Sequence, residues 1–211
     1  SSIAMLQALS NSQSVPMVRI PWSEPGIIMR MLDLGVMGII APMINTKKDC
    51  ENFVSFCKYP PIGQRSFGPM RAQLVHGMDY FENANSNILC FAMIETKEAI
   101  ENLDEILSVP NLTGVYIGPA DMSSSYGLKP KFDVKEDPVF SNIKLIAKKA
   151  KEYDKIAGIH NGTTQYAKEM ITIGYQLVTV SSDFRAMTSY AQSVVDEMKQ
   201  LTRKTNQSDT Y

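Results

Sequence analysis

Runs of apolar residues alternate with amphipathic stretches along most of the chain. The short apolar runs predict strands at residues 16–20, 38–43, 88–94, 114–117, 156–160 and 177–180. The amphipathic stretches predict helices at residues 25–34, 46–58, 97–107, 138–153, 163–173 and 183–204. Several strands are apolar at every position, as parallel strands covered on both faces are. This alternation predicts an α/β fold with a parallel sheet, either doubly wound or curled into a barrel.

A long polar stretch, residues 59–78, interrupts the alternation and is rich in Pro, Gly and Arg. We expect it to be a loop, and ordered loops of this length are uncommon unless they are functional. Arg65 lies within it among Gly and Pro residues, which let a backbone approach a ligand. Its guanidinium is a fixed fork for a carboxylate or an enolate oxygen. The alternative is an ordinary surface arginine in a surface loop.

Composition and charge narrow the class of protein. The 211 residues are 44% hydrophobic and 20% charged, which is ordinary for a globular protein, and we expect a single domain with a frayed tail at residues 204–211. The near balance of 21 basic and 22 acidic residues gives no electrostatic footprint for nucleic acid. We find no apolar run long enough for a membrane span and no signal-peptide layout at the start.

The cysteines are Cys50, Cys57 and Cys90. Their number is odd and none is spaced C-x-x-C, so a disulfide framework or a zinc ribbon is not expected. We interpret all three as packing residues in a reducing compartment, which favours a cytoplasmic protein.

Candidate site residues follow the predicted strands, because parallel architectures bind ligands beyond the carboxyl ends of their strands. The candidates are Pro21-Trp22, Pro42-Met43, Glu95, Asp121, His160 and Ser181-Ser182. Glu95 and Asp121 follow consecutive strands, which are usually adjacent, so their carboxylates would lie a few ångströms apart. A hard divalent ion would relieve their repulsion. Alternatively, Glu95 caps its helix and Asp121 caps a turn.

The remaining candidates also allow two interpretations. His160 could face the site, or it could bond a loop carbonyl at its strand end. Trp22 could wall the pocket, or it could simply pack at the rim. No lysine ends a strand, which argues against catalysis through a Schiff base.

Three motifs occur in order along the chain: YPPIGQRS at residues 59–66, MIETKEA at 93–99 and IGPADMS at 117–123. Their order and spacing resemble the HpcH/HpaI aldolases, the metal-dependent pyruvate aldolases of aromatic-acid and sugar-acid breakdown. The resemblance extends from about residue 15 to about residue 198. The VRIPW segment at residues 18–22 and the APM segment at 41–43 also look like the family.

The resemblance implies a (β/α)₈ barrel of the phosphoenolpyruvate/pyruvate-binding type and a set of site residues. Glu95 and Asp121 match the metal ligands of the family, for Mg²⁺ or Mn²⁺, with Co²⁺ as a further candidate. Arg65 matches the arginine that contacts the pyruvate oxygen. The backbone at Gly118 and Ala120 would hold the pyruvate carboxylate.

The implied activity is that of a metal-dependent carbon–carbon lyase. It would cleave the C3–C4 bond of a 4-hydroxy-2-oxo acid to give an aldehyde and a pyruvate enolate held by the metal and Arg65. The alternatives are a citrate-lyase-β-like acyl-CoA lyase and a non-catalytic barrel subunit kept for assembly. The resemblance also implies a homo-oligomer, commonly a hexamer, in which the helix at residues 184–201 packs on a neighbouring subunit.

The sequence departs from the family pattern in two places. Met93 stands where many members have Gln, which puts the substrate in doubt. At the front, residues 1–9 match the helix after the second strand of the family, so the first two strands and their His/Asp segment are not represented. We therefore expect a fragment, or a protein whose N-terminal part was not observed. The general base, the aldehyde partner and the identity of the metal remain open.

Overall fold

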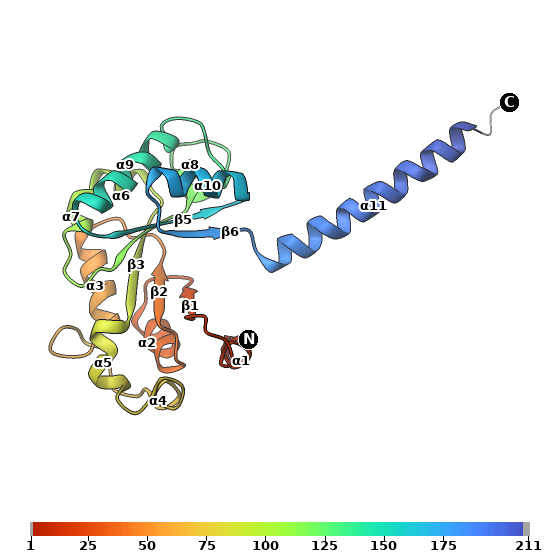
Figure 1. The fold of residues 1–211 in the computed structure, drawn as a ribbon. Coiled ribbons are helices and arrows are strands. Elements are labelled where there is room, and N and C mark those ends of the chain that lie inside the picture. The colour runs from red at the N-terminus through yellow and green to blue at the C-terminus, as the bar shows by residue number, and fades with distance from the viewer. Residues whose placement is uncertain (1, 209–211) are drawn as a thin grey trace.

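The computed structural model describes residues 2–208 and contains one parallel sheet (Figure 1). Its strands are β1 (Met17–Arg19), β2 (Gly38–Ala41), β3 (Leu89–Ile94), β4 (Gly114–Ile117), β5 (Ile156–Asn161) and β6 (Leu177–Val180). Each strand pairs in parallel with the next along the chain, so the spatial order is β1 to β6. The predicted strands and their parallel arrangement are confirmed.

The sheet is a curled, open half-barrel whose edges are β1 and β6 (Figure 1). Its two faces are read directly from the alternation of side chains along each strand. In β3, Cys90, Ala92 and Ile94 belong to the main hydrophobic core with the helices. Phe91 and Met93 belong to a smaller cluster with Ile40 and Tyr116. Because Ile40 is in register with Phe91, and Met93 with Tyr116, this smaller cluster lies on one face of the sheet, away from the helices.

Most helices begin and end where the sequence predicts. They are α2 (Pro25–Asp33), α3 (Lys47–Cys57), α9 (Val139–Glu152) and α10 (Thr164–Ile173). Thr46 and Asp49 form a capping box at the start of α3, and Thr163 caps α10 through the backbone N–H of Tyr166. These caps satisfy backbone donors that a helix leaves without partners at its first turn.

The structure corrects the expectation of a continuous loop over residues 59–78. Part of that stretch is helical, as α4 (Met70–His76), and α5 (Tyr80–Asn87) follows it directly. The helix expected at residues 97–107 is broken at Asn102 into α6 (Lys97–Glu101) and α7 (Leu103–Leu107). The Asn102 side chain donates to the backbone oxygen of Asn45 over 2.9 Å, a long-range contact that periodicity does not reveal.

Three further helices belong to the described part of the chain. α1 (Ser2–Leu9) precedes the sheet, and α8 (Pro119–Ser125) is a short helix that follows β4 directly. α11 (Asp183–Ser208) extends away from the rest of the molecule (Figure 1). It passes the expected end at Lys204, and the remainder of the expected tail, residues 209–211, lies outside the described residues. Within residues 2–208, no helix combines the length and the hydropathy needed to cross a membrane.

The three cysteines are buried, with free thiols, as predicted for packing residues. Burial, and secondarily the neighbouring Cys90, raises the pKa of Cys50 to about 12. At neutral pH Cys50 is therefore an uncharged, inert thiol.

Candidate active site

Glu95 follows β3 and is almost fully buried, with 2% of its surface exposed. Its Oε1 accepts a hydrogen bond from the backbone N–H of Met43 over 2.8 Å. Met43, which follows β2, adopts a φ of 56°, a left-handed conformation that residues with side chains rarely adopt. The other carboxylate oxygen of Glu95, Oε2, is also buried but accepts no hydrogen bond from any residue that the structure describes. A buried carboxylate oxygen without a partner is costly, so this oxygen calls for a donor or a cation.

The electrostatics around Glu95 identify its charged neighbours. Burial is the largest cause that raises the pKa of Glu95, and the negative charge of Asp121 raises it further. The hydrogen bond from Met43 lowers the pKa, and so does the positive charge of Arg19. Asp121 lies in the first turn of α8 and is exposed. The structure therefore brings the two predicted carboxylates into one electrostatic neighbourhood, with an arginine beside them.

Gly118, the residue that caps α8, lies against the free oxygen of Glu95. A Cβ atom at Gly118 would stand 2.3 Å from Glu95 Oε2 and 3.0 Å from the methyl carbon of Met93. Only glycine allows so close an approach between this backbone and the carboxylate. The glycine at the strand end is thus needed to keep the Glu95 oxygen in its place.

A cavity of about 320 Å³ lies beside this carboxylate pair. It is lined by Arg19, Ile40, Met93, Tyr116, Gly118, Pro119, Ala120, Asp121, Phe132 and His160. The cavity therefore brings together four of the predicted site residues, namely Gly118, Ala120, Asp121 and His160. Its volume suits a small polar molecule, and its walls combine charged groups with the apolar inner face of the sheet.

Arg19 is a candidate functional residue that the sequence reasoning missed. It is the last residue of β1, it is exposed, and it lines the cavity. Its side chain has no ion pair or hydrogen bond with any other residue of the described part of the chain. The sequence did contain a signal for Arg19. The candidates after this strand began at Pro21, whereas the charged side chain of Arg19 stands two residues earlier. The guanidinium is therefore open to an anionic ligand.

Arg65 lies elsewhere and is engaged by the protein itself. Its guanidinium donates to Asp33 Oδ1 over 2.7 Å and to the Tyr80 hydroxyl over 3.0 Å. It also stacks over the Tyr59 ring, with its guanidinium carbon 4.4 Å from the ring centroid. Only 1% of Arg65 is exposed.

The segment around Arg65 attaches to the amino ends of the strands. The backbone N–H of Arg65 donates to the oxygen of Lys58, whose ammonium donates to the oxygen of Ile88 just before β3. Glu95 lies at the other end of that strand. The expected contact of Arg65 with a pyruvate oxygen is therefore not supported, because the guanidinium is buried at the opposite end of the sheet from the carboxylate pair.

His160, the penultimate residue of β5, faces the cavity and is half-buried. Its Nδ1 lies 2.9 Å from Thr179 Oγ1, and the Tyr116 hydroxyl bonds the same oxygen. Burial, and secondarily the charge of Arg185, lowers the pKa of His160, while Asp133 raises it. The imidazole is therefore neutral at pH 7, and a neutral imidazole can accept a proton.

Trp22 lies outside this cavity. It is 60% exposed and lines a separate hollow together with Met43 and Asn45. The expectation that it walls the pocket is not supported, because Trp22 lines that separate hollow and does not line the cavity beside Asp121.

The donor set fits a divalent cation held by few protein ligands. Among residues 2–208, no group of three or more His, Cys, Asp or Glu side chains is placed to hold a metal ion. Glu95 and Asp121 supply two carboxylates, one of them with a buried oxygen that lacks a partner. Two carboxylates leave most of an octahedral shell to water and substrate, which is the usual habit of Mg²⁺.

Comparison with known proteins places this chain in a family. The family model for HpcH/HpaI aldolase/citrate lyase matches residues 1–188. The hydroxypyruvate/pyruvate aldolase of Rhizorhabdus wittichii is 38% identical over 197 residues, which cover 93% of this chain and 78% of the relative. The 5-keto-4-deoxy-D-glucarate aldolase of Escherichia coli O157:H7 is 31% identical, over 93% of this chain and 77% of the relative.

A solved structure agrees with these sequence matches. An HpcH/HpaI aldolase/citrate lyase family protein from Burkholderia cenocepacia superposes with a TM-score of 0.85 and 25% identity, over 93% of this chain and 79% of that one. With a family model matched over most of its length and an aldolase 38% identical to it, the chain belongs to the HpcH/HpaI aldolase/citrate lyase family.

Proposed function

We propose that this chain forms the site of a divalent-metal-dependent aldolase that cleaves a 4-hydroxy-2-oxo acid to pyruvate and an aldehyde. The single observation that carries the proposal is the buried Oε2 of Glu95, which has no partner among the described residues and lies beside the charges of Asp121 and Arg19. An assembly role alone requires none of these charges. The names of the relatives, which are aldolases, support the same reaction class.

Glu95 and Asp121 would hold the metal ion. When bound, a divalent cation supplies Lewis acidity that stabilises negative charge on the 2-oxo oxygen of the substrate. The hydrogen bond from Met43 fixes Glu95 Oε1, so that Oε2 is the oxygen left for the cation. Close contact with Gly118 keeps that oxygen from turning away.

Arg19 and the start of α8 would bind the 2-oxo acid. The Arg19 guanidinium offers a charged fork to the carboxylate or the oxo oxygen. Ala120 lies in the first turn of α8, where backbone N–H groups have no acceptor within the helix, and it lines the cavity. Arg19 thus takes the role that the family resemblance suggested for Arg65.

His160 would accept the proton of the 4-hydroxyl group as the C3–C4 bond breaks. Its Nδ1 faces Thr179, so its Nε2 is the nitrogen left for substrate. The lowered pKa keeps the ring neutral and able to act as a base. The apolar side chains of Met93 and Ile40 wall the cavity and would limit the access of water to the enolate.

We extend the proposal to the whole fold and its assembly. The six strands would be six of the eight strands of a (β/α)₈ barrel. This fits the comparison with the relatives, because the chain spans 77–79% of their lengths. The exposed apolar side chains of α11, among them Phe184, Met187 and Tyr190, would pack on a second copy of the chain. Sedimentation at several protein concentrations tests the assembly, and a monomer at all of them would refute it.

Exchange of the pyruvate methyl protons in D₂O tests the chemistry without knowledge of the aldehyde. The protein is incubated with pyruvate and Mg²⁺, with EDTA as the control, and loss of the methyl signal is followed by NMR. Metal-dependent exchange that is lost in Glu95→Gln supports an enolising metal site. Absence of Mg²⁺ and Mn²⁺ binding would refute the aldolase and leave the assembly subunit. Binding without exchange of pyruvate would refute pyruvate as product and direct attention to the acyl-CoA lyases of the same family.

A further inference from the structure

We propose that a basic hollow between α9 and α10 binds a small molecule that carries several linked phosphate groups. The hollow has a volume of about 650 Å³. Its charged lining residues are Lys144, Lys148, Lys151, Lys155 and Asp154. This inference goes beyond the proposed aldolase and does not depend on it, because none of these residues lines the cavity beside Glu95.

The basic hollow lies at the end of the sheet opposite to the carboxylate pair. It is lined by Ile156, the first residue of β5, and by Gln176, which directly precedes β6. Glu95 and Asp121 come after the last residues of β3 and β4. Because the strands run parallel, their amino ends lie together at one end of the sheet and their carboxyl ends at the other. The hollow is therefore separate from the candidate active site.

The spacing of the lysines along α9 gathers them at the hollow. Lys144, Lys148 and Lys151 are four and three residues apart, so they lie on one face of the helix. At about 1.5 Å per residue, this row of charges extends over about 10 Å. Asp154 has a φ of 54°, and the turn there ends α9 and brings Lys155 to the same hollow. The row is longer than one phosphate group and offers positions for several.

The ammonium groups retain donors for a ligand. Lys151 forms no ion pair with any residue that the structure describes. Lys148 lies 3.8 Å from Glu152, but their side chains are 75% and 46% exposed, and such pairs contribute little free energy. Lys155 donates one hydrogen bond to the backbone oxygen of Leu112 over 2.8 Å, and an ammonium group has three donors.

The hollow keeps a positive charge after the negative groups of its lining are counted. Four lysines and one aspartate leave three positive charges among the lining residues. Both α9 and α10 end beside the hollow, and the C-terminal end of a helix carries about half a negative charge. About two positive charges therefore remain at neutral pH, which favours a ligand with more than one negative charge.

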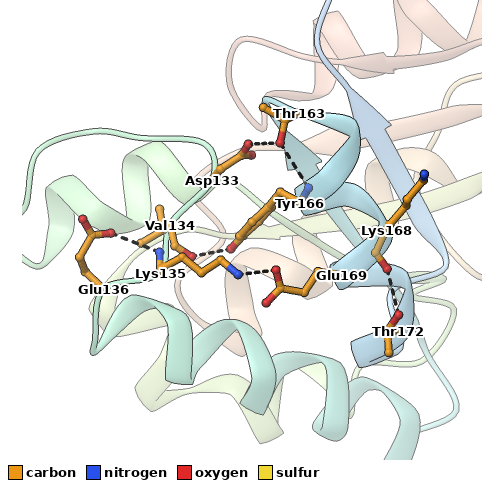
Figure 2. Close-up of polar contacts among 9 residues, drawn as sticks. All are labelled: Asp133, Val134, Lys135, Glu136, Thr163, Tyr166, Lys168, Glu169 and Thr172. Carbon is orange, nitrogen blue, oxygen red and sulfur yellow. Dashed lines mark hydrogen bonds and ion pairs between the residues drawn. The ribbon is translucent and has the colours of Figure 1, made fainter.

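The two helices that form the walls of the hollow are held at a fixed spacing. The hydroxyl of Tyr175, just after α10, donates to the backbone oxygen of Ile143 in α9 over 2.7 Å, and both residues are buried. The segment that leads into α9 is also bonded to α10, because the Tyr166 hydroxyl donates to the backbone oxygen of Val134 over 2.6 Å (Figure 2). A hollow with fixed walls loses little conformational entropy when a ligand binds.

The lining favours phosphate groups on a small molecule. Lysines bind phosphate oxygens as point charges, and the lining residues that the structure describes include no arginine fork to align a planar carboxylate. The volume lies within the usual range for small-molecule sites, about 300–1,000 Å³. The concave shape and the near balance of 21 basic and 22 acidic residues argue against an extended nucleic acid.

Isothermal titration calorimetry with sodium tripolyphosphate, without Mg²⁺ and at low salt, tests the proposal. Lys148→Gln/Lys151→Gln should weaken the binding of tripolyphosphate about tenfold, which corresponds to about 1.4 kcal/mol. Lys47→Gln/Lys48→Gln removes the same charge from exposed positions of α3 and should leave the affinity within about twofold. Orthophosphate should bind at least about tenfold more weakly, because it reaches fewer lysines. Thermal melts check that both double variants remain folded.

A second ligand distinguishes the two sources of linked phosphates. ATP carries three linked phosphates on a nucleoside. Binding of ATP at least as tight as that of tripolyphosphate would assign the hollow to nucleotides, and weaker binding would assign it to free polyphosphate.

Three results would overturn the proposal. They are no binding of tripolyphosphate at concentrations up to about 1 mM, equal weakening by the two double variants, and equal affinity for orthophosphate and tripolyphosphate. Exchange of pyruvate protons, measured separately with Mg²⁺, reports on the aldolase alone, so that failure of either proposal leaves the other standing.

Discussion

Asp33 and Arg65 form an ion pair with 2.7 Å between carboxylate oxygen and guanidinium nitrogen, and the side chain of Arg65 is wholly buried. The pair joins the end of α2 to the segment after α3, two stretches of chain that the sheet does not connect directly. The Tyr80 hydroxyl and the Tyr59 ring complete the surroundings of the guanidinium. The Asp33–Arg65 ion pair therefore contributes to the stability of the folded protein.

Replacement of Arg65 by Met should destabilise the protein. Removing one partner of a buried pair costs about 3–5 kcal/mol, and we expect the low end because the Asp33 side chain is 29% exposed. Urea unfolding measures the loss. Arg30→Met, at an exposed position of α2, is the control and should change the free energy of unfolding little. A variant at Arg65 with unchanged stability and lost activity would return this residue to the active site.

Replacement of Arg19 by Gln should give the opposite pattern. Because Arg19 is exposed and forms no hydrogen bond or ion pair with any residue that the structure describes, the Tm should stay within about 2 °C, as for most surface changes. Exchange of pyruvate protons should fall about 100-fold, since a charged donor to the substrate oxygen is lost. The Tm and the exchange rate together decide whether Arg19 acts on the substrate or stabilises the fold. Retained exchange would contradict a role on the substrate.

Replacement of Glu95 by Gln should stabilise the metal-free protein and abolish its affinity for metal. Burial raises the pKa of Glu95, so the folded state holds this proton more tightly than the unfolded chain does. The resulting stability is fully present below the unfolded pKa, about 4.3, and is lost as the pH rises through the raised folded value. At pH 7 the buried charge of Glu95 therefore destabilises the folded protein, and Glu95→Gln removes this destabilisation.

Thermal melts with and without Mg²⁺ check both statements. Without metal, Glu95→Gln should melt above the unaltered protein at pH 7, and the difference should vanish near pH 4. Excess Mg²⁺ should raise the Tm of the unaltered protein only, because loss of a ligand lowers the affinity by more than about tenfold. Equal stabilisation of both proteins by Mg²⁺ would mean that the ion binds elsewhere.

The strands and the carboxylate pair could be predicted from the sequence because both depend on local patterns. Continuous apolar runs such as Leu89–Ile94 indicate buried parallel strands, and a carboxylate directly after such a run lies at the ligand end of the sheet. Glu95 and Asp121 follow consecutive strands, and consecutive parallel strands are adjacent.

Arg65 and Arg19 could not be told apart by such patterns. What separates them is the contact of Arg65 with Asp33, which lies 32 positions away, and with Tyr80 on α5. The helix α4 was missed for a simpler reason, since Pro and Gly residues on both sides obscured a short run of helix-forming residues at Met70–His76.

Replacement of Gly118 by Ala should disable the site without unfolding the protein. The new Cβ would stand 2.3 Å from Glu95 Oε2, so the carboxylate must turn or shift. Affinity for Mg²⁺ should fall by more than about tenfold, because the ligand loses its fixed geometry. Gly68→Ala is the matched control, since its Cβ would meet only an Asp33 oxygen at 3.5 Å, an ordinary contact. Mn²⁺ titration followed by electron paramagnetic resonance measures both variants, and unaltered binding in Gly118→Ala would contradict the site geometry.

The pH dependence of catalysis should identify His160 as the base. The pKa of His160 is lowered by burial first and by Arg185 second, so the acid limb of kcat/KM should lie below about pH 6.5, the ordinary value for histidine. His160→Gln should remove this limb and lower the rate, whereas His76→Gln should keep it, because His76 lies in α4 and bonds the oxygen of Gly35. Arg185→Gln removes a positive charge that disfavours the imidazolium, so it should move the limb to higher pH. A limb that persists in His160→Gln would assign the proton to another group.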